Sequence, residues 1–195
     1  MRTFKQPLLK LSLIGFFFAT LIVSVCSEEP ATENAAMAPV LTTIATGANI
    51  AGTNGLAFSA DNKLYVASVI GSTISIIDPD SGEMLKTLTV EDGVVGPDDI
   101  AFGADGSYFW TSILTGEVAG FTPDGYKVVA AQLTPGVNPI TFSDDGRLFV
   151  SQCFFGTGLF EVDPKGIAEP RVIAEDLGPG CGLNGMDWGS DNRLY

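Results

Sequence analysis

Apolar and polar residues alternate in short runs along residues 40–195, and one group of runs recurs four times. Each copy begins with a five-residue, mainly apolar segment, continues through a turn rich in Ser, Gly, Asp and Asn, and ends in a β-rich run. The five-residue segments are NGLAF at 54–58, DDIAF at 98–102, NPITF at 138–142 and NGMDW at 184–188. Their aromatic anchors lie 44, 40 and 46 residues apart. A repeat of this length that holds several strands is typical of β-propeller blades.

The pattern predicts three complete units of four strands each. The expected strands are 55–59, 63–70, 73–78 and 84–90, then 99–103, 107–113, 117–122 and 127–132, then 139–143, 147–153, 158–163 and 170–175. Asp-Asn and Asp-Gly turns between the first two strands of a unit favour hairpins, because these residues tolerate positive φ. A β-sandwich would contain similar strands but has no reason to repeat them in groups of four. We therefore predict an all-β fold, a β-propeller domain at 40–195.

The fourth copy of the repeat stops at Tyr195, inside its second expected strand. A core strand that stopped there would leave an unpaired edge. We therefore expect the sequence to be a piece of a longer propeller, with about three and a half blades present.

The N-terminus differs in character from the rest of the chain. Residues 1–10 are basic and residues 11–26 carry no charge, which predicts a signal peptide or an N-terminal anchor at 1–26. Cys26 ends the apolar run, as in a bacterial lipoprotein, so a lipid on Cys26 is a third alternative. Residues 27–39 are small and polar and are expected to form a flexible linker. The chain is therefore expected to be exported, to the periplasm or the extracellular space, and to meet a membrane only through this leader or lipid.

The charge of the chain is strongly negative, −13 overall, and its 23 acidic residues all follow residue 27. Such a surface repels phosphate backbones, which excludes nucleic acid as an expected partner. The chain contains no His, so neither a Ser-His-Asp triad nor a typical zinc site can be built from it. Amide and carboxylate oxygens remain, and these suit hard cations such as Ca²⁺ or Mg²⁺.

The segment GLNGMDWGSDNRLY at 182–195 resembles the senescence marker protein, gluconolactonase and luciferin-regenerating enzyme family of six-bladed propellers. The segment GPDDIAFGADGSYFWTS at 96–112 is similar to the same family. The resemblance implies lactone hydrolysis with one divalent cation, Ca²⁺ most of all, in the central channel. It assigns Asn184 as a metal ligand and Asp98 and Asp99 to the substrate side. The family's Glu ligand in the first blade has no counterpart here, and its catalytic Asp would lie beyond Tyr195, so no catalytic residue is named.

The repeat itself leads to a similar site. Asn54, Asp98, Asn138 and Asn184 occupy one position of the repeat, at the start of the innermost strand, and should ring one end of the channel. We therefore predict Asn54, Asn138 and Asn184 as metal ligands. The alternative is that these residues only form turns before the strands, a common use of Asn and Asp.

Two cysteines follow the leader, and both are expected on the same face of the propeller. Cys153 ends the second strand of the third unit, and Cys181 lies in the loop that leads to the fourth. A disulfide between them is predicted for an exported protein, with two free thiols as the alternative. Phe154 and Phe155 on this face either line a substrate mouth or pack between blades.

Two functions remain open. The first is an exported, metal-dependent, gluconolactonase-type hydrolase acting on a small molecule such as a sugar lactone. The second is a non-catalytic propeller that binds a ligand or a protein through its loops, because fold alone does not decide function.

Overall fold

The computed structural model describes residues 40–178 and 183–195. The predicted leader at 1–26, the linker at 27–39 and Cys181 lie outside the described residues. All strands belong to one unit, Leu41–Tyr195, and apart from two single-turn 3₁₀ helices, η1 (Ala48–Ile50) and η2 (Val90–Asp92), the described part has no helix. Nowhere in that part is a helix long and apolar enough to cross a membrane.

Twelve strands form three antiparallel sheets, each built from four strands consecutive in sequence. The sheets are β1 (Thr53–Phe58), β2 (Leu64–Ser68), β3 (Thr73–Ile77) and β4 (Met84–Leu88); β5 (Pro97–Phe102), β6 (Tyr108–Ser112), β7 (Glu117–Phe121) and β8 (Lys127–Gln132); and β9 (Val137–Phe142), β10 (Leu148–Gln152), β11 (Leu159–Val162) and β12 (Arg171–Ala174). The predicted four-strand units are thereby confirmed. In the fourth repeat, a single bridge pairs Trp188 with Leu194.

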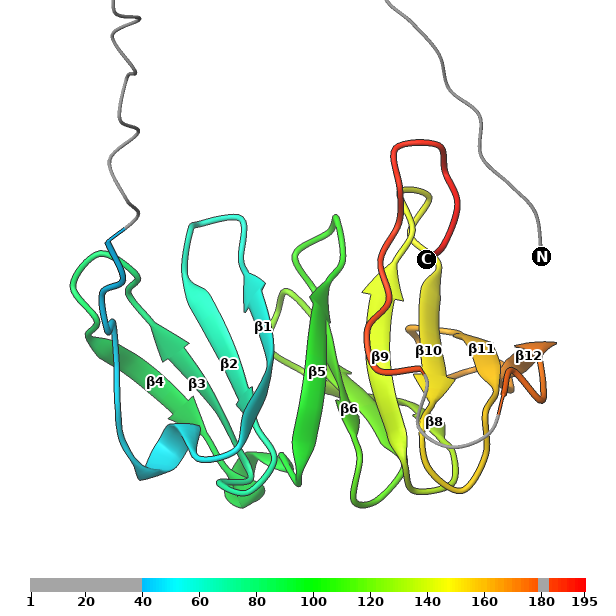
Figure 1. Ribbon diagram of the computed structural model, residues 1–195, viewed down its shortest axis with the longest axis horizontal. Helices are drawn as coiled ribbons and strands as arrows, with labels where there is room; N and C mark the ends of the chain where they lie inside the picture. Colours follow the sequence, from blue (N-terminus) through cyan, green and yellow to red (C-terminus); the bar gives the residue numbers. More distant parts are fainter. Residues whose placement is uncertain (1–39, 179–182) are drawn as a thin grey trace, which may run out of the picture. The chain divides into compact units, whose positions relative to one another are not determined.

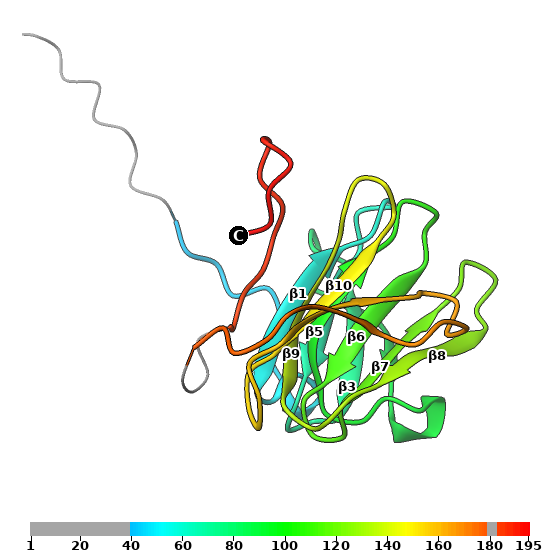
Figure 2. The same cartoon turned by 90° about the vertical axis from the view of Figure 1, so that its right-hand side faces the viewer.

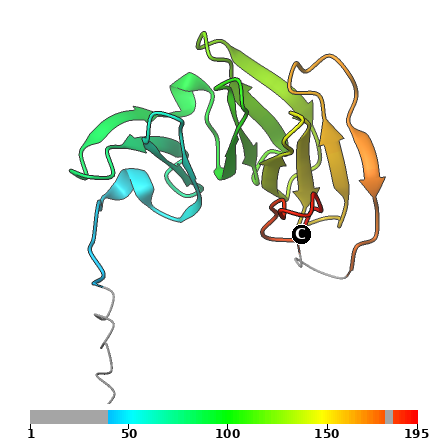
Figure 3. The ribbon, with the colours of Figure 1, turned by 90° about the horizontal axis from the view of Figure 1, so that it is seen from above.

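The three sheets follow one another as the blades of a propeller do (Figures 1 and 3). The first strand of each sheet contacts the first strand of the next, so β5 lies between β1 and β9. These first strands gather on one side of the unit, and β8 lies on the opposite side (Figure 2). The ends where β1, β5 and β9 begin, and where β2, β6 and β10 end, share one face, because the paired strands are antiparallel. This face is called the upper face here; in Figure 1 it lies at the bottom of the picture.

Two apolar layers fill the spaces between the sheets. Ile74, Ile100 and Trp110 belong to the layer between the first and second sheets, and Trp110 is fully buried. Phe109 and Leu148 belong to the layer between the second and third sheets. The second sheet lies between both layers, and burial of both its faces explains why its strands read as nearly continuous apolar runs instead of strict alternations.

The four hairpin turns after the first strand of each repeat share one geometry. Asn62, Gly106, Gly146 and Asn192 hold their last position, with φ of 60°, 88°, 81° and 59°. Each donates its backbone N–H to the carbonyl three residues earlier, at 2.9–3.0 Å. Only Gly and Asn occur at this position because a left-handed backbone disfavours other side chains.

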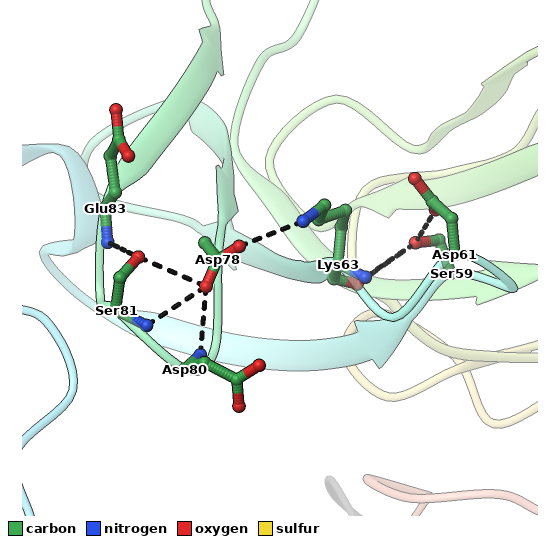
Figure 4. Close-up of polar contacts among 7 residues, drawn as sticks. All are labelled: Ser59, Asp61, Lys63, Asp78, Asp80, Ser81 and Glu83. Atoms are coloured by element: carbon green, nitrogen blue, oxygen red, sulfur yellow. Dashed lines mark hydrogen bonds and ion pairs between the residues drawn. The ribbon is translucent and has the colours of Figure 1, made fainter.

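Side chains complete the turns on the same end of the first sheet (Figure 4). Asp78 accepts hydrogen bonds from the backbone N–H groups of Asp80 and Ser81, and its other oxygen lies 3.0 Å from Lys63 Nζ. These contacts hold the pKa of Asp78 well below its usual range, with the Ser81 backbone bond as the largest cause. The end of the sheet opposite the upper face, called the lower end here, is therefore polar, and contacts among its own residues hold its turns in place.

Candidate functional site at the upper face

Three of the residues predicted to ring the channel, Asn54, Asp98 and Asn138, lie inside the first strands, at a β-bulge in each, whereas Asn184 lies outside any strand. Thr53 pairs with Ser68 and Leu56 with Val66, so β1 has one residue more than β2 between these pairs. The register of β5 against β6 and of β9 against β10 shifts in the same way. The extra residues are found within Asn54-Gly55, Asp98-Asp99 and Asn138-Pro139. A bulge of this kind re-aims a side chain out of the regular alternation.

Two hydrogen bonds join the predicted ring residues in pairs across neighbouring repeats. Asn54 Nδ2 donates to Asp98 Oδ1 at 2.7 Å, and Asn138 Nδ2 donates to Asn184 Oδ1 at 2.7 Å. The partners are 44 and 46 residues apart in sequence. The residues at the repeat position that the sequence singled out thus form two pairs at the upper face, and among the described residues no side-chain hydrogen bond joins one pair to the other.

Asp98 is the most unusual member of the ring. Its side chain is only 2% exposed, and Oδ2 is buried without a hydrogen-bond partner among the described residues. Burial raises the pKa of Asp98, and the hydrogen bond from Asn54 lowers it in part. A buried carboxylate oxygen without a partner is costly, because the charge loses its hydration and gains nothing in return. Such an oxygen fits a bound cation.

Asp99, predicted on the substrate side, is engaged by the backbone. Its Oδ1 accepts from the N–H of Ile100 at 2.9 Å, and its Oδ2 accepts from the N–H of Ile140 at 3.1 Å. The second bond crosses from β5 to β9. Burial raises the pKa of Asp99, and these two bonds oppose the rise. Asp99 therefore ties two neighbouring bulges together.

A hydroxyl that the sequence did not single out completes this link. Thr111 on β6 accepts a hydrogen bond from the N–H of Asp99 at 3.3 Å and donates to the carbonyl of Asn138. Thr111 is fully buried. Its position one residue before the end of the strand run YFWTS gave no signal in sequence, because Ser and Thr are also ordinary strand residues.

The backbone of β1 also approaches β5 closely at the ring. A Cβ added at Gly55 would lie 2.6 Å from Asp99 Cα and 2.7 Å from the Asp98 carbonyl oxygen. Only glycine fits at such a distance. The sequence phrase Asn54-Gly55 thus combines a ring side chain with the glycine that lets it reach Asp98.

The cysteine prediction is tested for one partner only. Cys153 is 1% exposed and takes part in a disulfide. Its predicted partner Cys181 lies outside the described residues, so the pairing stays a prediction. The neighbouring Phe154 and Phe155 are 46% and 87% exposed, so they do not pack between blades.

The described residues contain clefts elsewhere as well. One of about 490 Å³ lies between the first and second sheets at the lower end, where Tyr65, Phe102 and Tyr108 form its aromatic wall. Its charged residues are Asp61 on a turn, Lys86 on the outer strand β4 and Asp92 in η2. No ring residue lines it, so this cleft is separate from the candidate site.

Comparison with known proteins confirms the fold. No protein-family model matches the chain, and no curated protein matches it. Solved structures do match: virginiamycin B lyase from Staphylococcus aureus gives a TM-score of 0.61 at 17% identity, over 73% of this chain and 47% of that one. A chain of the nidogen/laminin complex gives 0.61 at 21% identity, over 73% and 54%. A candidate 6-phosphogluconolactonase from Bacteroides uniformis gives 0.53 at 20%, over 73% and 46%.

These likenesses establish the β-propeller fold that the repeat and the resemblance both predicted. The chain spans about half the length of the propellers it matches. The matched proteins differ in what their names describe, a lyase, a nidogen/laminin complex and a 6-phosphogluconolactonase, so the function must be argued from the site.

Proposed function

We propose that the upper-face ring binds a divalent cation, Ca²⁺ first and Mg²⁺ as the alternative, and that the protein is an exported lactonase-like hydrolase. The observation that carries the proposal is the buried Asp98 Oδ2, which has no partner among the described residues. Asn54 occupies the other oxygen of this carboxylate, so Oδ2 is left to face a ligand. Asn54, Asn138 and Asn184 supply amide oxygens of the kind that hard cations accept.

In this proposal Asp98 joins the cation ligands instead of contacting substrate. Asn54 orients the carboxylate, and Asp99 with Thr111 fixes the spacing of the bulges that carry Asp98 and Asn138. A cation held there would supply polarisation of a lactone carbonyl. Export is supported by the leader-like N-terminus and by the disulfide at Cys153, because disulfides persist in oxidising compartments.

One observation favours the alternative, a non-catalytic binding propeller. The described residues contain no cluster of three His, Cys, Asp or Glu side chains able to hold a metal. A ring with one carboxylate and three amides binds Ca²⁺ more weakly than a ring with several carboxylates, because ligand charge sets the affinity.

A Ca²⁺ titration of thermal unfolding tests the cation site. The melting temperature of the wild type should rise through the millimolar range, since a ligand bound only to the folded state stabilises it by about 2.7 kcal/mol at one hundred times its Kd. Asp98→Asn should abolish the rise. Asp124→Asn, an exposed carboxylate on the lower turn between β7 and β8, should leave it intact. No rise in the wild type contradicts the cation site.

Hydrolysis of glucono-δ-lactone and of γ-decalactone, each followed with a pH indicator, then separates the two functions. Ca²⁺-dependent hydrolysis that disappears in Asp98→Asn supports the hydrolase. A Ca²⁺-stabilised protein that hydrolyses no lactone supports the binding propeller.

A further inference from the structure

Three loops of the upper face carry a large apolar side chain at the same repeat position. The second residue after β2, β6 and β10 is Ile70, Leu114 and Phe154, with exposed fractions of 78%, 57% and 46%. Single exposed apolar residues are common on protein surfaces. Three of them at one repeat position, on one face, form a set that we call the apolar collar.

A glycine in each blade seats the collar against the strand that carries the ring. Gly52, Gly96 and Gly136 each lie two residues before a ring residue and have φ of 66°, 49° and 100°. A Cβ added there would lie 2.7 Å from Ile70 Cγ1, 2.6 Å from Leu114 Cδ1 and 2.8 Å from Phe154 Cβ. The collar side chains therefore cover the backbone that leads into the ring.

Backbone hydrogen bonds repeat the same connection in all three blades. The residue just before each collar residue donates its N–H to the carbonyl of the glycine: Val69 to Gly52 at 3.2 Å, Ile113 to Gly96 at 3.2 Å, and Cys153 to Gly136 at 2.7 Å. The place of the collar is thus fixed by the fold.

Phe155 extends the collar in the third blade at an energetic cost. It is 87% exposed and has φ of 59°, in the left-handed region. A bulky side chain rarely adopts this conformation, and such outliers cluster at ligand-binding positions. Cys153, two residues earlier, is buried and disulfide-bonded, which holds the loop in place.

We propose that the apolar collar binds an alkyl or aryl substituent of the substrate, so that the preferred lactone is an apolar-substituted one and not a bare sugar lactone. This inference rests on the proposed function of the ring. The polar ring with its buried carboxylate is suited to the lactone group, and the collar residues contact glycines that lie two residues before the ring residues. The hydroxyl groups of a sugar lactone would face Ile70, Leu114 and Phe154 without hydrogen-bond partners.

The test compares two lactones that share one ring, γ-butyrolactone and γ-decalactone, the second of which adds a hexyl chain. Binding to the full chain in Ca²⁺ is measured by ligand-observed NMR, which requires no turnover. We expect γ-decalactone to bind about tenfold more tightly, since each buried methylene contributes favourably. Leu114→Ser and Phe154→Ser should each weaken its binding about fivefold and leave γ-butyrolactone unchanged.

Ile167→Ser is the matched control. Ile167 is 83% exposed and lies on the lower turn between β11 and β12, so its replacement should change neither affinity. Decanol serves as an alkyl probe without a lactone. If decanol competes with γ-decalactone at equal affinity in the presence and absence of Ca²⁺, the collar is a general apolar surface and the inference is wrong.

Two further results distinguish a failure of the collar inference from a failure of the proposed function. Equal binding of the two lactones, with a normal Ca²⁺ shift of the melting temperature, overturns the collar inference and leaves the proposed function standing. Absence of both lactone binding and the Ca²⁺ shift overturns the two together.

Discussion

Phe109 on β6 packs edge-on against Phe142 on β9, with ring centroids 5.9 Å apart and planes at 63°. The same pair of repeat positions meets in the other blades, as Tyr65 with Phe102 at 4.9 Å and as Phe149 with Trp188 at 5.4 Å. In each case an aromatic residue of the second strand of one repeat contacts the aromatic anchor of the next repeat. The aromatic residues that mark the repeat in sequence are therefore the residues that join consecutive blades.

Phe109→Ala should destabilise the protein by about 3–5 kcal/mol, because Phe109 is 1% exposed and its removal leaves a cavity between two sheets. Phe58→Ala is the comparison variant, because Phe58 holds the repeat position of Phe142, the partner of Phe109. Phe58 is 57% exposed, so the loss should stay below about 1 kcal/mol. Urea unfolding measures both. Equal losses of stability would mean that the aromatic contact between blades does not account for the contribution of Phe109.

The strands were predictable because two features coincide in the sequence, short β-rich runs separated by hairpin-turn residues and the repeat of about forty residues. Observed and predicted ends agree within two residues. The one systematic difference is that β1, β5 and β9 each begin two residues earlier than expected. Asn54, Asp98 and Asn138 were expected at the start of these strands, whereas they lie within them, in bulges.

The bulges could not be predicted from the sequence, because a bulge depends on the register between two strands and leaves no fixed residue signature. The ring position itself was visible as one column of the repeat. The contact of Asn54 with Asp98, and that of Asn138 with Asn184, join residues more than forty positions apart. Only the packing of consecutive blades determines which side chains meet.

The hairpin turns give a prediction with its control inside the chain. Gly106 has φ of 88° and open space around its Cβ position. Gly106→Ala should therefore cost about 1 kcal/mol through the backbone alone. Gly106→Asn should cost clearly less, because Asn62 and Asn192 occupy the same turn position at φ near 60°. Thermal unfolding of the two variants decides, and an Ala variant as stable as the Asn variant would contradict the turn argument.

The contacts of Glu161 with two arginines predict how the free energy of unfolding depends on pH in the acid range. Arg147 contacts it through two hydrogen bonds of 2.8 and 2.9 Å, and Arg171 Nε donates a third at 2.9 Å. Arg147 first and then Arg171 lower the pKa of Glu161 from 4.5 to about 2. A depressed carboxyl pKa stabilises the folded state above pH 4.5, and this stabilisation is lost as the pH falls from 4.5 towards 2.

Glu161→Gln should therefore flatten the decline of unfolding free energy between pH 4.5 and 2, measured by urea titration at several pH values. The comparison variant is Glu169→Gln, whose glutamate is exposed and forms no ion pair within the described residues. It should leave the wild-type slope unchanged. A slope that is identical in all three proteins would show that the Arg147 and Arg171 contacts do not persist in solution.

Gly55 gives the sharpest test of the packing behind the ring. Its Cβ position lies 2.6 Å from Asp99 Cα, so Gly55→Ala must push β1 away from β5, at a cost of about 1–3 kcal/mol. The same shift would break the 2.7 Å bond from Asn54 to Asp98, and the Ca²⁺ response should weaken with it. Gly185→Ala is the repeat-matched control, because Gly185 has no neighbour within 4 Å of its Cβ position among the described residues. Urea unfolding with and without Ca²⁺ measures both variants. A loss of stability without any change in the Ca²⁺ response would separate the packing of the blades from the cation site, and would show that Asp98 holds its position without Asn54.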